Sequence, residues 1–163
     1  ASLMRVASNS GTPTLGICFG HQLLCKSLGS EVTRAETMSS GVWDLSLNEA
    51  GLEDELFGLR KERADGPVVL YSHQDHVITV PECCELLGSA EHNAVTAVRV
   101  IGKDGKKLPA WGLQFHPEAA KDRIERSFGW GHISEEEMLA FQREHDGAGV
   151  LEAFGDVVLN HRR

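Results

Sequence analysis

Apolar residues recur along this chain at two spacings, one typical of strands and one typical of helices. Short apolar or alternating runs predict strands at Thr12–Ile17, Glu31–Arg34, Val42–Leu47, Val68–Tyr71, Leu86–Ala90, Ala94–Ile101 and Leu108–Phe115. Helical spacing predicts helices at Phe19–Leu28, Leu52–Leu59 and Val150–Leu159, and a further helix that opens at Ser134 and runs to Phe141. This mixture of elements predicts an α/β fold.

Local signals mark the ends of several of these elements. Asp104-Gly105 lies between two predicted strands and predicts a hairpin turn. Ser134 and Glu137 have the spacing of a capping box at the start of a helix. We expect Gly147 and Gly149 to end the helix that opens at Ser134, before the last helix, Val150–Leu159.

Composition narrows the class of protein. With 163 residues and 41% hydrophobic content, residues 1–163 are expected to form a single domain. The net charge of −8 argues against nucleic acid or an anionic membrane as a partner. No apolar run approaches the ~20 residues that span a bilayer, and the N-terminus lacks the apolar segment of a secretory signal. Four cysteines do not make a disulfide scaffold, so we expect a reducing, cytoplasmic location.

The first candidate for chemistry is Cys18, between Gly16 and Gly20, where a predicted strand meets a predicted helix. A nucleophile on a sharp strand-to-helix turn needs small neighbours, as in the G-x-S-x-G turn of serine hydrolases. The helix N-terminus also favours the thiolate that reacts. A buried structural cysteine beside a turn is the alternative for this motif taken alone.

A second motif, W-G-L-Q-F-H-P-E at residues 111–118, supplies the partners that a nucleophilic thiol needs. A base must take the proton of the thiol, and a third group must fix the tautomer of that base. His116 and Glu118 stand two positions apart, so an extended backbone directs both side chains to one side. Glu118 is then expected to hold one ring nitrogen of His116 while the other faces Cys18.

Together, G-I-C-F-G-H-Q and G-L-Q-F-H-P-E resemble the class I glutamine amidotransferases, the triad-type glutaminases. The resemblance implies Cys18 as nucleophile, His116 as general base and acid, and Glu118 as the residue that orients it, with no cofactor. It implies a flavodoxin-like, doubly wound fold with a mostly parallel sheet, flanking helices and an antiparallel strand section, incomplete at its N-terminal side.

The resemblance also implies residues that bind substrate. The backbone N–H of Phe19 would supply half of the oxyanion hole, and Gln22 would contact the substrate glutamine. The stretch Y-S-H-Q-D-H-V at residues 71–77 is similar to a segment of GMP-synthase-like members. In those proteins, backbone groups around the positions of Ser72 and His73 hold the amino-acid end of glutamine.

The chain departs from the family before its nucleophile. Family members have several strands and helices there, with a glycine-rich loop that gives the second oxyanion N–H, whereas this sequence has about a dozen residues. We therefore expect roughly the C-terminal two-thirds of a family domain. Three explanations stand: a shortened form of a longer domain, which we favour, a segment completed by a partner chain, or a homologue without activity.

The expected activity is release of ammonia from the side-chain amide of glutamine through a γ-glutamyl thioester. The ammonia would pass to a synthase subunit or domain. A γ-glutamyl peptidase acting on γ-glutamyl peptides or conjugates is an alternative, because the acyl transfer is the same. A regulatory or interaction homologue that has lost turnover is another, because half of the oxyanion hole is missing.

Other residues have simpler interpretations. His21, His73 and His76 lack zinc-ligand spacing and an accompanying C-x-x-C pair, so no metal site is expected. Cys25 lies on the first predicted helix and is expected to be buried packing. Trp130 lies in a glycine-rich stretch, where a structural role is favoured over a place at the site entrance.

Overall fold

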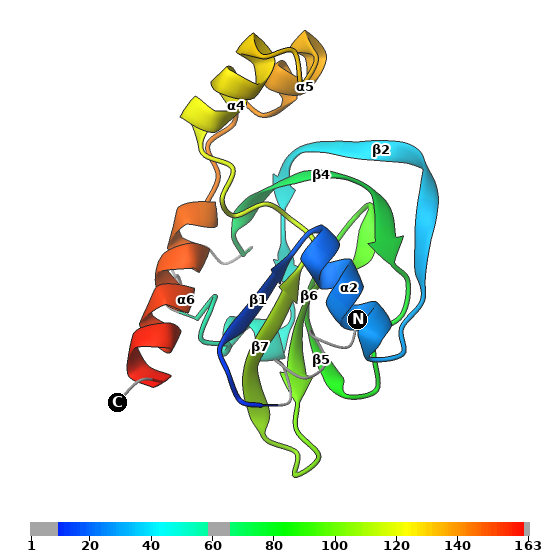
Figure 1. Ribbon diagram of the computed structural model, residues 1–163, viewed down its shortest axis with the longest axis vertical. Helices are drawn as coiled ribbons and strands as arrows, with labels where there is room; N and C mark the ends of the chain where they lie inside the picture. The colour runs from blue at the N-terminus through cyan, green and yellow to red at the C-terminus, as the bar shows by residue number, and fades with distance from the viewer. Residues whose placement is uncertain (1–9, 59–65, 162–163) are drawn as a thin grey trace.

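The computed structural model describes residues 10–58 and 66–161. Its main sheet has the strand order β1-β7-β6-β5-β3, with bounds Thr14–Ile17 (β1), Lys107–Leu113 (β7), Asn93–Ile101 (β6), Cys84–Ala90 (β5) and Ser46–Leu47 (β3) (Figure 1). β1 pairs in parallel with β7, whereas the other neighbouring strands of this sheet are antiparallel. The structure confirms the predicted α/β fold and its antiparallel section.

The expectation of a mostly parallel sheet is wrong for the part of the chain that the structure describes. β5, β6 and β7 follow one another through short turns, and a short turn joins only antiparallel neighbours. The predicted hairpin between β6 and β7 is present: the Gly102 N–H donates to the Lys106 carbonyl at 2.8 Å, and Gly105 has a φ of 79°. β1 comes from elsewhere in the sequence and is therefore free to pair in parallel.

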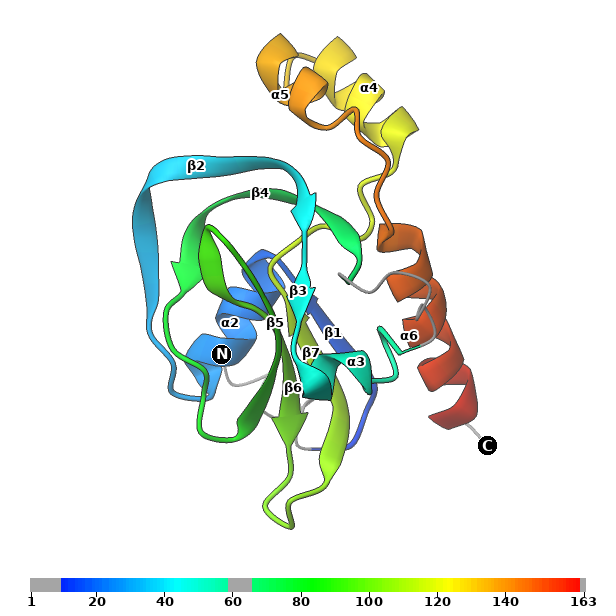
Figure 2. The ribbon, with the colours of Figure 1, turned by 180° about the vertical axis from the view of Figure 1, so that it is seen from behind.

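A second sheet arches past one end of the main sheet (Figures 1 and 2). It consists of β2 (Val32–Asp44) and β4 (Val68–Val77), which are antiparallel. The two strands predicted over residues 31–34 and 42–47 are instead one long strand, β2, followed by β3. Residues 35–40 of β2 lie mostly at the surface, so no apolar pattern marks them as strand. Residues 68–71 of β4 are all buried, as the apolar run predicted.

The helices flank the main sheet. α2 (Phe19–Ser27) lies on one face, and α3 (Glu49–Leu52) and α6 (Gly147–His161) lie on the other (Figures 1 and 2). α4 (Lys121–Gly129) and α5 (Glu135–Ala140) form a hairpin that extends beyond the sheet. Within residues 10–58 and 66–161, no helix has both the length and the apolar character needed to cross a membrane.

The helix predicted at Leu52–Leu59 is wrong. The helix begins earlier, because the Asn48 side chain caps α3 by accepting a hydrogen bond from the Gly51 N–H at 2.9 Å. Residues 53–58 form turns, and Leu59 lies outside the described residues. The capping box predicted at Ser134 is present at the start of α5.

Gly147 and Gly149 lie in the first turn of α6 instead of ending the preceding helix, so this prediction is also wrong. The break falls earlier, between α5 and α6. A Cβ at Gly147 would lie 2.5 Å from the carbonyl oxygen of Pro117, so a close approach of two backbones requires glycine there. α4 was not predicted, because its only two apolar side chains, Ile124 and Phe128, stand among mostly charged residues, and only Ile124 is buried.

The core occupies both faces of the main sheet. Successive residues of β7 point to opposite faces. Trp111 packs in the cluster that includes Val150 and Ala153 of α6, while Ala110 packs with Leu24 of α2. Cys25 of α2 is fully buried, as expected.

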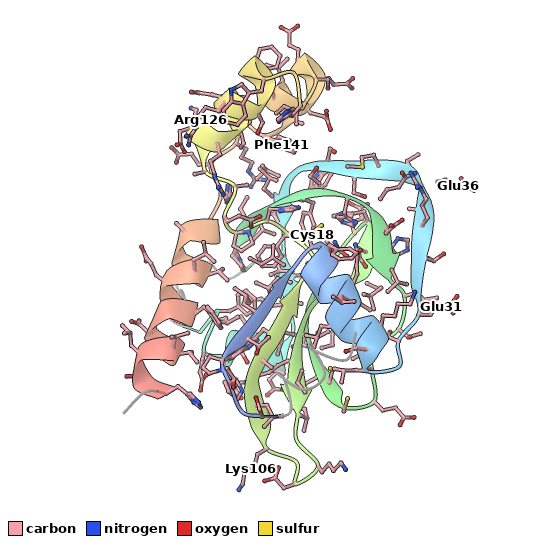
Figure 3. The ribbon with its side chains drawn as sticks, viewed as in Figure 1. Cys18, Glu31, Glu36, Lys106, Arg126 and Phe141 are labelled. Carbon is pink, nitrogen blue, oxygen red and sulfur yellow. The ribbon has the colours of Figure 1, made fainter. Side chains whose placement is uncertain are left out.

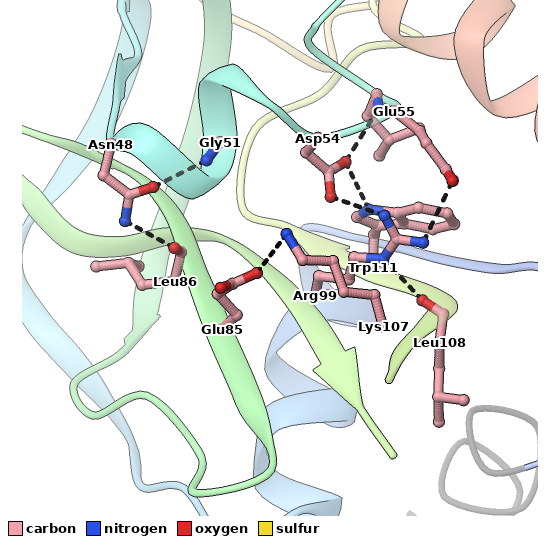
Figure 4. A network of polar contacts seen from close by, with 11 residues as sticks. Asn48, Gly51, Asp54, Glu55, Glu85, Leu86, Arg99, Lys107, Leu108 and Trp111 are labelled. Atoms are coloured by element: carbon pink, nitrogen blue, oxygen red, sulfur yellow. Dashed lines mark hydrogen bonds and ion pairs between the residues drawn. The ribbon is translucent and has the colours of Figure 1, made fainter. Parts of the chain in front are cut away.

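A buried ion pair ties the segment after α3 to the sheet (Figure 4). Arg99 Nη1 donates to Asp54 Oδ2 at 3.0 Å, and Trp111 Nε1 donates to Asp54 Oδ1 at 3.0 Å. The Arg99 guanidinium also lies over the Trp111 ring, 4.4 Å from its centroid. Arg99 Nε donates to the Leu108 carbonyl at 2.9 Å, so three elements share one polar network.

Candidate active site

The parallel pairing of β1 with β7 brings the two sequence motifs together. Ile17 lies opposite Leu113 in the register, and the N–H of the next residue, Cys18, donates to the Leu113 carbonyl at 2.7 Å. His116 follows soon after Leu113. Because parallel neighbours end at the same edge of a sheet, residues far apart in the sequence meet there.

Cys18 lies on a strained turn between β1 and α2. Its φ of 49° and ψ of −101° make it the one non-glycine residue with a positive φ in residues 10–58 and 66–161. Such strain persists only where the surrounding structure enforces it, and it is common at active sites. A Cβ at Gly16 would lie 2.7 Å from the Gly20 carbonyl oxygen, whereas a Cβ at Gly20 would meet no described atom within 4 Å. The steric requirement expected for both glycines therefore applies only to Gly16.

His116 and Glu118 are hydrogen-bonded, with Nδ1 of the imidazole 2.8 Å from Oε1 of the carboxylate. The other ring nitrogen is thereby left for Cys18. Burial lowers the pKa of His116, but the hydrogen bonds to Cys18 and Glu118 and their charges more than offset burial and raise the pKa to about 10. Burial raises the pKa of Glu118, yet the hydrogen bond to His116 leaves it below its ordinary value. The pair is an imidazolium held by a carboxylate near neutral pH.

Two further groups lie against the Cys18 sulfur. Sγ donates to the Ser72 carbonyl at 3.9 Å, and Gln114 Nε2 donates to Sγ at 3.6 Å. Gln114 is fully buried, and its Oε1 accepts from Gln22 Nε2 at 3.3 Å. Gln22 Nε2 also donates to the Asp75 carbonyl at 2.7 Å. The two amides form a chain of hydrogen bonds behind the sulfur.

A cavity of about 620 Å³ opens beside Cys18. Ser72, His116 and Glu118 line it together with Cys18. Another wall comes from the α4–α5 hairpin and consists of Arg123, Ile124, Arg126, Ser127, Trp130, Ile133 and Phe141. Figure 3 shows Arg126 and Phe141 on this hairpin, beyond the end of the sheet that carries Cys18. Trp130 therefore lies at the site, contrary to the structural role favoured from the sequence.

The other residues expected to bind substrate are placed differently. Ser72 lines the cavity, but Gln22 and His73 do not. Gln22 is 7% exposed, and His73 is 5% exposed, with its Nδ1 3.1 Å from the Asp75 carbonyl. Burial lowers the pKa of His73 to about 4, so its ring is neutral. Both side chains lie behind the cavity surface.

Phe19, the first residue of α2, has a backbone N–H without a partner among the described residues. The first N–H groups of any helix lack an acceptor within the helix. Phe19 directly follows Cys18 in the sequence, so its N–H is the group that the family resemblance assigns to the oxyanion hole.

His21 is a packed core residue. Its Nε2 lies 3.1 Å from the Val95 carbonyl, and burial lowers its pKa to about 4. A Cβ at Gly112 would lie 2.5 Å from Nδ1 of His21. The His21 ring can therefore pack against β7 only because this position of the strand is a glycine. In the described ranges, no three His, Cys, Asp or Glu side chains are grouped so as to hold a metal ion.

Two contributors to the site were not identified from the sequence. Gln114 lies two positions before His116 in the same motif, and that spacing was a usable signal, because it directs both side chains to one side of an extended backbone. Arg123 lies on α4, which carries no motif and only two apolar side chains, Ile124 and Phe128.

Known proteins resemble the chain over much of its length. Residues 1–128 match the sequence profile of the family described as Glutamine amidotransferase class-I. GMP synthase (glutamine-hydrolyzing) from Symbiobacterium thermophilum is 42% identical over 108 residues, which are 66% of this chain and 19% of that protein. One subunit of the GMP synthase (glutamine-hydrolyzing) from Methanococcus maripaludis is 34% identical over 117 residues, which are 71% of this chain and 56% of that protein.

Solved structures show the same fold. The crystal structure of a glutamine amidotransferase from Thermotoga maritima matches with a TM-score of 0.68 at 21% sequence identity. The match covers 97% of this chain and 67% of that chain. The mixed sheet and its flanking helices are therefore shared with glutamine amidotransferases.

Proposed function

Because the chain belongs to the class I glutamine amidotransferase family, we propose that it hydrolyses the side-chain amide of glutamine in the cavity beside Cys18. One observation carries the proposal: Cys18 on its strained turn, His116 and Glu118 meet at one edge of the sheet and line one cavity. The two relatives are named as glutamine-hydrolyzing enzymes, which supports the same reaction.

In the proposed first step, Cys18 Sγ, deprotonated as the thiolate beside the His116 imidazolium, attacks the side-chain carbonyl carbon of glutamine. The His116 imidazolium gives its proton to the leaving nitrogen as the C–N bond breaks. Ammonia departs, and a γ-glutamyl thioester remains on Cys18. The raised pKa of His116 supports this role, because the proton is in place at neutral pH.

In the second step, His116 takes a proton from water as that water attacks the thioester. The C–S bond breaks, glutamate leaves, and the imidazolium and the thiolate are restored. Glu118 holds Nδ1 throughout, so the other ring nitrogen carries every proton transfer.

The Phe19 N–H is proposed to stabilise the oxyanion formed in both steps. Removing one oxyanion donor typically lowers the turnover rate by about 10²–10³-fold, so the Phe19 N–H should account for a large part of the rate acceleration. Backbone groups at Ser72 are proposed to hold the amino-acid end of glutamine, since Ser72 lines the cavity. Gln22 and His73 would support that surface from behind.

The ammonia is proposed to pass to a synthase subunit. The relative from Methanococcus maripaludis is itself named as one subunit of a GMP synthase, which supports a partner of this kind. The chain spans about half the length of that relative, so the whole activity of such an assembly is part of the proposal.

Glutamate release from glutamine tests the proposed reaction. We expect the purified chain to release glutamate, and Cys18→Ala to lower the rate by at least about 1,000-fold. Cys83→Ala is the matched control, because Cys83 is partly exposed and does not line the cavity. Equally low rates for the wild-type chain and Cys18→Ala would reject the proposal and favour a regulatory or interaction homologue.

A further inference from the structure

The ring of His92 joins the main sheet to the second sheet. Ala90 pairs with Asn93 in the register, so β5 and β6 are joined by a two-residue turn, and His92 is the second residue of that turn. The centroid of the His92 ring lies 4.7 Å from that of Trp43 on β2 and 4.6 Å from that of Tyr71 on β4. Both distances fall in the range of about 4.5–7 Å at which aromatic rings attract one another. One side chain of the main sheet thus contacts both strands of the second sheet.

On β4, the ring contacts fall on the two residues that flank Ser72. The His92 ring contacts Tyr71 and also lies 5.6 Å from the ring of His73. Tyr71 and His73 are buried, whereas Ser72 lines the cavity and its carbonyl accepts from Cys18 Sγ. Successive residues of a strand point to opposite faces. The ring cluster therefore lies directly behind the part of β4 that forms the cavity wall.

The cluster favours neutral histidine rings. His73 Nδ1 donates to the Asp75 carbonyl at 3.1 Å, because a carbonyl oxygen only accepts. His73 Nε2 is buried and has no hydrogen-bond partner among the described residues, so a proton on it would be an unsatisfied buried donor. Burial lowers the pKa of His92, and the charge of His76 lowers it further, while that of Glu91 opposes both.

The charges that act on the His92 ring come from two elements. β4 contributes His73 and His76, and the turn itself contributes Glu91. The contact from β2 is the Trp43 ring, which carries no charge. A proton on His92 would therefore place a cation beside two other histidines, with one carboxylate to offset it.

We propose that His92 is a positioning residue whose neutral ring holds β4 at Ser72 in the geometry that binds glutamine, and whose protonation in mild acid releases β4 and weakens binding. The inference rests on the proposed function, in which the backbone at Ser72 holds the amino-acid end of glutamine. His92 does not line the cavity. It therefore acts on substrate affinity through β4 and takes no part in the proton transfers at Cys18.

The pH range of the release follows from the sign of the shift. Because the pKa of His92 is lowered in the folded state, the neutral ring contributes fully to stability above the ordinary value of 6.5. This contribution is lost as the pH falls below 6.5 and through the lowered pKa. His116, with its pKa raised to about 10, stays protonated over the same acidic range.

The kinetic test measures KM for glutamine at about pH 7.5 and about pH 5.5. For the wild-type chain, KM should rise about fivefold in acid. His92→Phe keeps a ring that cannot be protonated, so its KM should change by less than about twofold, with the same pH dependence of kcat as the wild type. His161→Phe, at the exposed end of α6, is the matched control and should behave like the wild type. Loss of folded protein would lower kcat and leave KM unchanged, so KM separates positioning from general destabilisation.

Hydrogen exchange of the β4 amides tests the release of β4 without any turnover. At about pH 5.5, the amides of residues 68–77 should exchange at least about fivefold faster in the wild-type chain than in His92→Phe. At about pH 7.5, the two proteins should exchange at the same rate. Comparing two proteins at one pH cancels the effect of pH on the exchange chemistry.

Equal changes of KM in the wild-type chain and His92→Phe overturn the inference and leave glutamine hydrolysis intact. A lower KM in acid would mean that the charged ring binds Trp43 more tightly through a cation–π contact, and this too overturns the inference. If no protein hydrolyses glutamine, the proposed function fails, and the exchange rates still decide whether His92 holds β4. Faster wild-type exchange in acid then supports that role, and equal exchange overturns it.

Discussion

Gln114 Nε2 donates a hydrogen bond to Cys18 Sγ over 3.6 Å, from a side chain that is fully buried. The direction of this bond is set by the next amide, since Gln114 Oε1 accepts from Gln22 Nε2. Gln22 Nε2 also donates to the Asp75 carbonyl, and a carbonyl oxygen only accepts. The backbone of β4 thereby fixes which end of Gln114 faces the sulfur.

Gln114→Leu should lower glutamate release by about tenfold to a hundredfold. Leucine cannot donate a hydrogen bond to Cys18 Sγ, and a hydrogen bond to a charged group, as the attacking sulfur is proposed to be, is worth about 1.5–3 kcal/mol. The rate at which iodoacetamide alkylates Cys18 should fall with it. Gln114→Glu keeps the shape but adds a negative charge beside the sulfur, so its loss should be larger. Wild-type rates in both variants would show that the Gln114 donor has no role in reactivity.

Glu118→Gln should narrow the pH range of activity on its alkaline side. Burial lowers the pKa of His116, but Cys18 and Glu118 raise it by more, so the pKa is about 10. A neutral glutamine removes the charge of Glu118, so the pKa of His116 should fall toward its ordinary value of 6.5. Proton donation to the leaving nitrogen needs the imidazolium, so activity should decline at a lower pH in the variant. A pH profile of glutamate release measures this shift.

The same pKa gives a stability prediction of defined sign. A group with a raised pKa in the folded state stabilises the fold fully below its unfolded value, 6.5 for His116. This contribution is lost as the pH rises from 6.5 to about 10. The loss should be smaller in Glu118→Gln than in the wild-type chain, while Glu152→Gln, on the exposed side of α6, should match the wild type. Identical alkaline behaviour of Glu118→Gln and the wild type would contradict the pairing.

The sequence predicted the centre of the site more fully than its walls. Cys18, His116 and Glu118 stand in motifs whose local backbone, a strand end followed by a turn, is readable from glycine and apolar spacing. The wall formed by the α4–α5 hairpin was only partly predicted: Ser134 and Glu137 marked the start of α5, whereas α4 has just two apolar side chains, Ile124 and Phe128, and buries only Ile124. Asp104-Gly105 predicted the antiparallel pairing of β6 with β7. The directions of the other pairings were hidden, since each depends on whether a short turn or a distant strand supplies the neighbour.

Alkylation should be selective for Cys18. Burial raises the pKa of Cys25 to about 12, and burial also raises that of Cys84, so both stay protonated at neutral pH. Cys18 instead lines an open cavity beside the His116 imidazolium. Peptide mapping after brief treatment with iodoacetamide should show Cys18 modified at least about tenfold faster than the other three cysteines. Comparable labelling of Cys18 and Cys83 would remove the case for an activated thiolate.

Asp54→Ala should destabilise the fold by about 3–5 kcal/mol, because it leaves the buried Arg99 guanidinium without its partner. The Trp111 N–H loses its acceptor as well. Glu55→Gln is the matched control: its side chain is 57% exposed, 3.3 Å from Arg99, and its change should stay below about 1 kcal/mol. Urea denaturation measures both. Equal, small changes would show that the network contributes little to stability.

Gly16→Ala and Gly20→Ala should separate the two glycines that flank Cys18. A Cβ at Gly16 would lie 2.7 Å from the Gly20 carbonyl oxygen, so the turn must shift, and we expect a loss of about 1–3 kcal/mol. A Cβ at Gly20 meets nothing within 4 Å, and alanine favours a helix over glycine by about 1 kcal/mol, so the melting temperature should hold or rise. Thermal unfolding by circular dichroism compares the two variants. Equal destabilisation would mean that the turn constrains Gly20 as tightly as Gly16.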